Sequence, residues 1–435
     1  MIKEITVPMW DQMQVFCKHI ADHQIRLVLH FDRILDEKIL KDAVEKSVKN
    51  NPIICAKYTE GNKKPLWRFT DIHLDEIYFY TECQEPERLF NDILLKSLNT
   101  FTGPQLTVSL IRSKGDTLIL NCNHAISDAA GVKNFIYQLA HNYSLLSQNK
   151  TVPEQDYTPS RSLKILSEKL RAREKASVLK AMLSNKKSAP TFSNTVDLNH
   201  LQNPGFKTYT ISPAAFDKIK EFGKDHSATV NDMLLAIIYY TLKMILPNSN
   251  KTNRFTYSSD LRPYLDRSSY DVLSNYSAIH NIDIDNTADG FVTVLKEISG
   301  LTKDRKQMKY SLADFPLMAV LFNTIPYRKL KGIFHKEFDK IKGGRSNASP
   351  SLSNTGIIEE KKVNFGGMLP SSAYILGGVN HPGLLQVVLS TYKKHLTLSI
   401  GSYYNDKNTM FISHFIEELK ATISDQLFIK STQIV

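Results

Sequence analysis

Hydrophobic positions in the first third of the chain follow the spacings of strands and helices in turn. Residues 25–31 are almost all apolar, which is typical of a buried strand. Across residues 36–50 the apolar side chains recur every three or four positions, and this predicts a helix that a nearby proline would end. Residues 106–112 and 117–123 predict a hairpin, because a short polar turn joins two strand-like runs. The other elements predicted here are a strand at 53–58 and a helix at 87–98.

The second half of the chain mixes strand and helix patterns in the same way. A strand at 206–211 leads into a helix at 214–223, with Ser212 as its capping residue and Pro213 at its first position. The most apolar helix, 233–246, is interrupted by a lysine and is too short to span a bilayer. The remaining predicted elements are strands at 254–258 and 277–284, a hairpin of 385–390 with 396–403, and a helix at 411–423.

The length of the chain indicates two domains, because 435 residues are too many for one simple core. Residues 151–190 differ from the chain on either side: prolines open and close this stretch, and a Lys/Arg-rich helical pattern lies between them. Such a stretch suits a crossover linker or a charged surface helix, and the two are compatible. We predict an N-terminal domain at 1–160, a crossover linker at 161–190 and a C-terminal domain at 191–435.

Composition indicates a globular protein, with 42% hydrophobic and 23% charged residues. The net charge of +11 is spread along the chain. It indicates either a solvated basic surface or attraction to an anionic partner: coenzyme A phosphates, an acidic carrier protein or an anionic membrane surface. No nucleic-acid-binding motif accompanies the charge, which argues against nucleic acid as a partner. Four scattered cysteines without CxxC spacing argue against a disulfide framework and a zinc site, and the absence of a secretory pattern at the N-terminus favours a cytoplasmic location.

A histidine stands where a predicted strand meets a predicted helix. The strand-like run 117–123 continues into the pentapeptide 124–128, which begins with His124 and ends with Asp128, and an amphipathic helix is predicted at 132–143. An imidazole at such a junction can lie in a cleft, where a pKa near neutrality lets it accept a proton from a hydroxyl or an amine. That chemistry suits an acyltransferase, and a histidine that only fills a loop is the simpler alternative.

The same spacing occurs a second time, at His335 and Asp339. The surrounding stretch, 331–342, mixes charged and apolar residues as a solvated helix does. Residues four apart on a helix are neighbours, so we predict an exposed pair that supports the helix by at most about a few tenths of a kcal/mol.

Several separated segments together resemble the chloramphenicol-acetyltransferase-like superfamily, which includes peptide-synthetase condensation domains, alcohol acyltransferases and wax ester/diacylglycerol acyltransferases. The segment 124–128, with Gly131, is similar to the HxxxD signature of that superfamily. The other similar segments, in the family's order, are 51–53 (NPI), 229–236 (TVNDMLLA), 260–265 (DLRPYL), 274–277 (SNYS) and 353–356 (SNTG). The chain departs from the pattern at Asn123, where many members have a first histidine, and at Ala129, where they have glycine. It also lacks a DFGWG segment.

The resemblance implies an α/β (α+β) fold of two chloramphenicol-acetyltransferase-like subdomains, each a mixed sheet flanked by helices, with an active-site tunnel between them. It implies that His124 is the catalytic base, which takes the acceptor's proton as the acceptor attacks a thioester carbonyl. It also implies that Asp128 pairs with Arg262 and, together with Gly131, has a structural role at the site.

Five further residues are candidates for the oxyanion site or the tunnel wall. Ser353 and Asn354 can stabilise an oxyanion through side-chain or backbone donors, or their segment can be no more than a strand bulge or turn. Asn275 and Ser277 have the same two interpretations. Trp10 either lines the tunnel or is an aromatic residue of the core.

These inferences predict an O- or N-acyltransferase of lipid or secondary metabolism, which moves an acyl group from a thioester to a small-molecule alcohol or amine. No metal and no bound cofactor are expected, and the co-substrate is an acyl-CoA or an acyl carrier protein thioester. The alternative is a catalytically silent, condensation-like module that binds a carrier protein or a lipid, supported only by Asn123 and Ala129. A lipid synthase with weak contact to a membrane surface is a third alternative.

Overall fold

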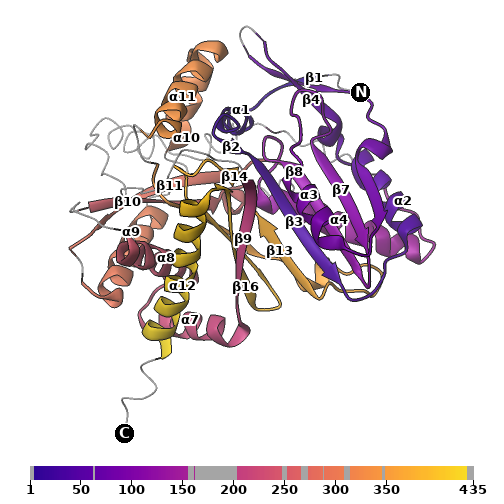
Figure 1. Cartoon of the computed structure of the whole chain (residues 1–435). Helices are drawn as coiled ribbons and strands as arrows, with labels where there is room; N and C mark the ends of the chain where they lie inside the picture. The colour runs from indigo at the N-terminus through magenta and orange to yellow at the C-terminus, as the bar shows by residue number, and fades with distance from the viewer. Residues whose placement is uncertain are drawn as a thin grey trace.

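Two large mixed sheets lie side by side in this protein, with helices packed against them (Figure 1). The structure, a computed structural model, describes residues 4–61, 64–154, 161, 203–246, 252–265, 273–287, 289–307, 314–344 and 348–428. A small third sheet has the strand order β1 (Glu4–Thr6), β5 (Leu66–Phe69) and β4 (Ala56–Thr59). Apart from Arg161, the predicted linker at 161–190 lies outside the described residues.

The first sheet carries the N-terminal half of the chain and one strand from the C-terminal half. Its order is β13 (Ser372–Leu376), β3 (Gln24–Phe31), β8 (Asp116–Asn123), β7 (Leu106–Arg112) and β6 (Tyr78–Glu82). Neighbouring strands are antiparallel except β6 and β7, which are parallel. Strand β3 and the hairpin of β7 with β8 confirm the elements predicted from the apolar runs.

Helices cover both faces of this sheet, and the two faces of its central strands differ in composition. These helices are α2 (Glu37–Lys49), α3 (Pro86–Leu95) and α4 (Ala129–Ser147). Leu27 and Leu29 of β3 belong to the core that α2 and α4 share, whereas Val28 packs in a separate cluster with Leu94 of α3. Successive side chains of a strand point to opposite faces, so Arg26 and His30 share the second face with Val28, while the first face is apolar.

The second sheet carries the C-terminal half of the chain and one short N-terminal strand. Its order is β11 (Ser277–Asp285), β10 (Thr252–Asp260), β12 (Ser351–Ile357), β15 (Gln386–Tyr392), β16 (His395–Tyr404), β14 (Val379–Asn380) and β2 (Ala21–Asp22), and β9 (Asn203–Ile211) also pairs with β16. A second core lies between this sheet and the helices α7 (Pro213–Asp225), α8 (Val230–Ile245), α9 (Phe291–Gln307) and α12 (Asp406–Phe428). Ser212 caps α7 by accepting a hydrogen bond from the backbone of Ala215, as predicted.

Each half of the chain lends a strand to the sheet of the other half. Strand β13 pairs with β3, and strand β2 pairs with β14. Main-chain hydrogen bonds therefore join the two halves, and they hold the connection from β2 to β3 beside the C-terminal sheet. The domain boundaries at residues 160 and 191 stay predictions.

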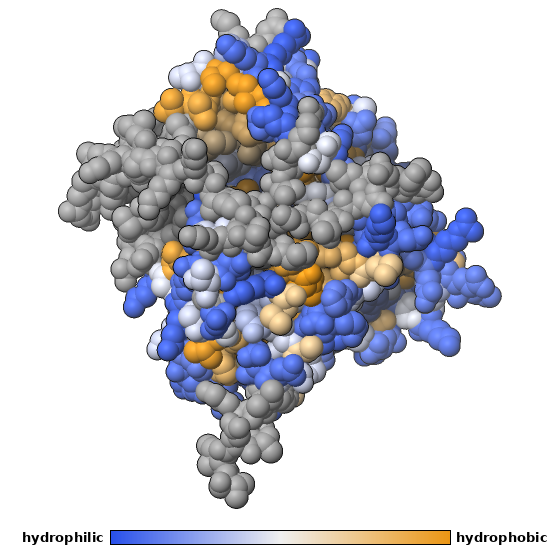
Figure 2. All heavy atoms as spheres, turned by 60° about the vertical axis from the view of Figure 1, so that its left-hand side comes forward, coloured by the Kyte–Doolittle hydropathy of each residue, from blue (hydrophilic) through white to orange (hydrophobic). Residues whose placement is uncertain are grey.

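Two C-terminal helices pack against the first helix of the chain. The three helices are α1 (Met9–Cys17), α10 (Asp314–Thr324) and α11 (Tyr327–Lys342). The ring of Phe16 stacks on Phe322 and Phe334, with centroid distances of 6.0 and 5.4 Å. Figure 2 shows hydrophobic surface near the top of the molecule, where Figure 1 draws α10 and α11, and Val320 and Ile333 are exposed on these helices.

The predicted pair of His335 with Asp339 lies on a helix as expected, but its two described side chains share no hydrogen bond. The carboxylate of Asp339 accepts a hydrogen bond from Nε2 of His19, at 2.7 Å. The ring of His335 stacks on the ring of His19, with 4.1 Å between their centroids. Because α11 lies against the segment that follows α1, a tertiary contact replaces the contact within the helix.

The strand predicted at 53–58 begins later than expected. Residues Pro52–Cys55 form a short 3-10 helix, and β4 starts only at Ala56. Proline at the first position has a fixed φ and no N–H to donate, which suits the start of a helix and not a paired strand. No single helix in the described ranges has the length and apolar character of a membrane span; only α7 and α8 taken together, which meet at 103°, have both.

Candidate active site

Main-chain and side-chain hydrogen bonds fix the position of His124 directly after β8. The N–H of His124 donates to the carbonyl of His23, at 3.1 Å. The preceding residue, Asn123, is fully buried, and its amide donates to Thr100 and to Gln105, both at 2.7 Å. The side-chain oxygen Oδ1 of Asn123 in turn accepts a hydrogen bond from the N–H of Ala125. Asn123 therefore anchors the turn that presents His124.

Asn275 determines which nitrogen of His124 carries a proton. Its Nδ2 lies within hydrogen-bond distance of three acceptors: the carbonyls of His124 (2.9 Å) and Ala125 (3.2 Å) and a carboxylate oxygen of Asp11 (2.9 Å). These acceptors fix the orientation of the amide, so its Oδ1 faces Nδ1 of His124, at 3.2 Å. An oxygen acceptor at this place requires Nδ1 to be the donor. Nε2 is then the unprotonated nitrogen, which is the form of histidine that a general base needs.

A buried ion pair supports Asn275 from behind. Asp11 of α1 is 1% exposed, and its second carboxylate oxygen accepts from Trp67 Nε1 at 3.0 Å and from Arg161 at 2.8 and 3.1 Å. Arg161 also donates to the carbonyl of Ile126, inside the pentapeptide, at 2.7 Å. Asp11 and Arg161 thus hold both Asn275 and the loop. The sequence analysis missed both residues, because nothing local marks an acid in α1 or an arginine at the edge of the predicted linker.

Asp128 holds the loop and does not contact the imidazole. Its carboxylate caps α4 by accepting from the N–H of Gly131 at 3.0 Å, and it accepts two hydrogen bonds from Arg262, both at 2.9 Å. It also accepts from the N–H of Tyr276 and from the hydroxyl of Ser277. No hydrogen bond joins Asp128 to His124, two residues that the structure describes. The expected pair of Asp128 with Arg262 is present.

These contacts set the charge states of the two motif residues. Burial on its own raises the pKa of Asp128, but the charge and hydrogen bonds of Arg262 outweigh it, and the pKa falls below its ordinary value of 3.8. Burial lowers the pKa of His124 below 6.5, and the weaker effects of its hydrogen bonds and of Asp128 raise it. At neutral pH the site therefore holds a charged, paired aspartate and an uncharged, half-buried imidazole.

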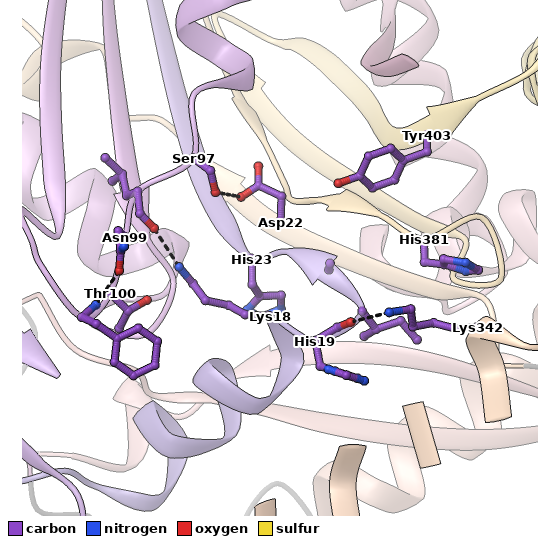
Figure 3. Close-up of a pocket in the computed structure, with 14 residues that line it drawn as sticks. Lys18, His19, Asp22, His23, Ser97, Asn99, Thr100, Lys342, His381 and Tyr403 are labelled. Carbon is purple, nitrogen blue, oxygen red and sulfur yellow. Dashed lines mark hydrogen bonds between the residues drawn. The ribbon is translucent and has the colours of Figure 1, made fainter. Parts of the chain in front are cut away.

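A cavity of about 630 Å³ lies beside the site; His23 is part of its wall and His124 is not. The His23 ring lines this cavity and stacks on the ring of His124, with 4.7 Å between centroids and 12° between planes. Figure 3 shows the cavity wall, to which the connection from α1 to β3 contributes Lys18, His19 and His23. The rest of the wall comes from residues 97–101 and from Lys342, His381 and Tyr403.

The family model of the condensation domain matches residues 12–251, more than half of the chain. The chain belongs to the condensation-domain family. The matched range includes His124 and Asp128, and it confirms the resemblance to the chloramphenicol-acetyltransferase-like superfamily. No curated protein matches the sequence.

Solved structures show the condensation-domain fold over nearly the whole chain. The first condensation domain of the CDA synthetase has 12% identity and a TM-score of 0.71, with coverage of 98% of this chain and 97% of that one. The trichothecene 15-O-acetyltransferase of Fusarium sporotrichioides has the same identity and TM-score, with coverage of 96% and 95%. The condensation domain of the Monacolin K polyketide synthase MokA has 11% identity and a TM-score of 0.67, with 98% of each chain covered. At these identities the likeness concerns the fold, which is mixed α/β with two subdomains.

Within this condensation-domain fold, the remaining candidates lie in different places. Ser353 and Asn354 are on β12, where the pairing with β15 is irregular between Asn354 and Ile357 and Gly356 has a φ of +75°. The bulge that was the alternative interpretation is therefore present. Ser353 accepts from Ser258, and Asn354 contacts Asn231 and the N–H of Gly356. No hydrogen bond joins Ser353 or Asn354 to His124, and all three residues are described.

The other two candidates also have defined surroundings. Ser277 bonds to Asp128, and so it supports the loop and not the imidazole. Trp10 is half-buried on α1, next to Asp11. Among the described residues, no group of three or more His, Cys, Asp or Glu side chains is placed to hold a metal ion.

Proposed function

We propose that this protein transfers an acyl group from a thioester to an alcohol or an amine, with His124 as the general base. The observation that carries the proposal is the orientation of the Asn275 amide, which requires Nδ1 of His124 to carry the proton and leaves Nε2 as the acceptor. The lowered pKa of His124 supports the same role, because the base is uncharged at neutral pH. Membership of the condensation-domain family supports acyl transfer as the reaction class.

The proposed reaction balances without a cofactor. The acceptor's O–H or N–H gives its proton to Nε2 of His124 while the oxygen or nitrogen forms a bond to the thioester carbonyl carbon. The tetrahedral intermediate then collapses, the C–S bond breaks, and the imidazolium returns the proton to the leaving thiolate. The products are an ester or amide and a free thiol, and His124 is again neutral. Both an acyl-CoA and an acyl carrier protein thioester fit this proposal as the acyl donor.

The alternative of a silent binding module loses support from the surroundings of Asn123. The Asn123 amide makes hydrogen bonds that shape the turn, so the absence of a first histidine leaves the position of His124 well defined. General-base assistance of this kind accelerates a reaction by about 10²–10⁴-fold. That range sets the loss expected when the imidazole is removed.

The test follows free thiol released from a panel of acyl-CoA and acyl carrier protein donors with alcohol and amine acceptors. We expect release by the wild type, a loss of about 10²–10⁴-fold in His124→Ala, and an unchanged rate in His335→Ala. His335→Ala is the matched control, because it removes the histidine of the same His-x-x-x-Asp spacing on α11. Circular dichroism must show both variants folded. A wild type that binds a carrier but releases no thiol, or a His124→Ala variant at full rate, would contradict the proposal.

A further inference from the structure

The register of the first sheet places a second imidazole at the proposed site. Strands β3 and β8 are antiparallel, and Gln24 and Asn123 are their last paired residues. His23 and His124 are the next residues beyond this pair, and the N–H of His124 still donates to the carbonyl of His23. Directly opposed residues of an antiparallel pair have their side chains on the same face. The stack of the two rings is therefore a consequence of strand pairing.

Neighbouring contacts hold the backbone on which His23 lies. Asp22, the residue before it, accepts hydrogen bonds from Arg26, from Gln24 and from Ser97, and Arg26 also donates to the carbonyls of Leu94 and Gly377. Arg26 is fully buried. The turn between β2 and β3 is thus fixed on both sides of His23, and the imidazole has a defined place above His124.

The nitrogens of His23 are not engaged by the rest of the fold. Its Nδ1 is buried without a hydrogen-bond partner, and no hydrogen bond to its Nε2 exists among the described residues. A buried polar atom without a partner costs free energy. What the ring does provide is a flat aromatic face on His124 and part of the cavity wall.

The surroundings of His23 disfavour a positive charge on its ring. Burial lowers the pKa of His23 well below 6.5, and charge on His124 and on Lys18 lowers it further. The other charged or titratable groups of the cavity wall are His19, Asp22, Lys342, His381 and Tyr403. When His124 takes the acceptor's proton, the neighbouring ring of His23 therefore stays neutral.

We propose that His23 is a positioning residue for acyl transfer: its ring covers one face of the His124 ring and holds the plane of that ring. This inference rests on the function proposed for His124. Asn275 fixes one edge of the His124 ring through Nδ1, and His23 fixes its face. Together the two contacts restrict both the rotation and the tilt of the base.

Two substitutions of His23 separate positioning from other roles. His23→Phe keeps a flat aromatic ring and removes both nitrogens, whereas His23→Ala removes the stack. We expect kcat to fall about tenfold to a hundredfold in His23→Ala with little change in KM, because small misplacements of a reacting group have effects of this size. In His23→Phe we expect kcat to stay within about threefold of wild type.

NMR titration of His124 supplies a readout that does not depend on activity. In His23→Ala, water reaches the imidazole and the pKa of His124 rises towards its ordinary value; in His23→Phe it stays low. The inference is overturned if His23→Ala leaves kcat and the titration unchanged, if His23→Phe loses as much kcat as His23→Ala, or if both variants raise KM alone. If the wild type transfers no acyl group, the proposed function fails, and the titration still decides whether His23 controls His124.

Discussion

Two segments of this chain have the same spacing of histidine and aspartate. In both segments the histidine ring stacks on the ring of another histidine. His124 stacks on His23, and His335 stacks on His19. The two partners lie on the same short connection between α1 and β3. In both stacks the ring planes differ by 12°.

The two aspartates differ completely in their surroundings. Asp128 is 2% exposed and shares two hydrogen bonds with buried Arg262, whereas the side chain of Asp339 is 53% exposed and meets half-buried His19. The backbone explains the difference. On α11 the spacing of four puts histidine and aspartate on one exposed face. At the end of β8 the chain turns between the two residues, so the histidine stacks on His23 while the aspartate caps α4. The same spacing therefore has different structural consequences within a helix and at a junction where a strand ends and a helix begins.

We expect the largest difference between the two segments in the free energy of unfolding after their aspartates are replaced. Asp128→Ala leaves the buried charge of Arg262 without its main partner, and breaking such a pair costs about 3–5 kcal/mol. Asp339→Ala, on the exposed face of α11, should leave the free energy of unfolding close to that of wild type. Urea denaturation at neutral pH measures both, because the lowered pKa of Asp128 means that its pair contributes fully above about pH 4 and is lost only as pH falls through the folded value. Equal stabilities of the two variants would show that Asp128 does not hold the loop.

Local patterns in the sequence were enough for the elements that carry His124. The apolar runs of β3 and β8, the polar turn before β8 and the helix after Asp128 are each encoded within about twenty residues. The family-like segments added the contact of Asp128 with Arg262, which is 134 residues away. These features could be predicted because each depends on the types of residues at short spacing along the chain.

Contacts between distant parts of the chain could not be predicted in this way. The ion pair of Asp11 with Arg161 spans 150 residues, and β13 joins β3 although more than 300 residues separate them. The partner of Asp339 lies in the N-terminal half for the same reason. His23 carries no local motif at all, and only the strand register brings it to His124.

We expect a smaller effect, on kcat, when the contacts that hold the rings of His124 and His335 are removed. The ring of His124 is fixed by a hydrogen bond from Nδ1 to Asn275. Asn275→Ala should therefore allow the proton to lie on either nitrogen and the ring to rotate, and it should lower kcat by about tenfold to a hundredfold. The control is Asp339→Ala, which removes the acceptor beside the other stack and should leave kcat within about twofold of wild type. Steady-state thiol release measures both variants. A rate for Asn275→Ala equal to that of the control would refute the tautomer argument.

The smallest expected effect is the pH at which the base becomes charged. Burial lowers the pKa of His124, so kcat/KM should decline as pH falls, with a midpoint below 6.5. The unfolded chain binds protons on its histidines near pH 6.5, whereas the folded chain keeps His23 and His124 neutral to lower pH, so stability also decreases below 6.5. A parallel denaturation series therefore has to show the protein folded at every pH used. His335→Ala should keep the same midpoint, because His335 and its stack on His19 take no part in the reaction. A midpoint at or above 6.5 in the folded wild type would mean that the base is more exposed to water than its place between Asn275 and His23 allows.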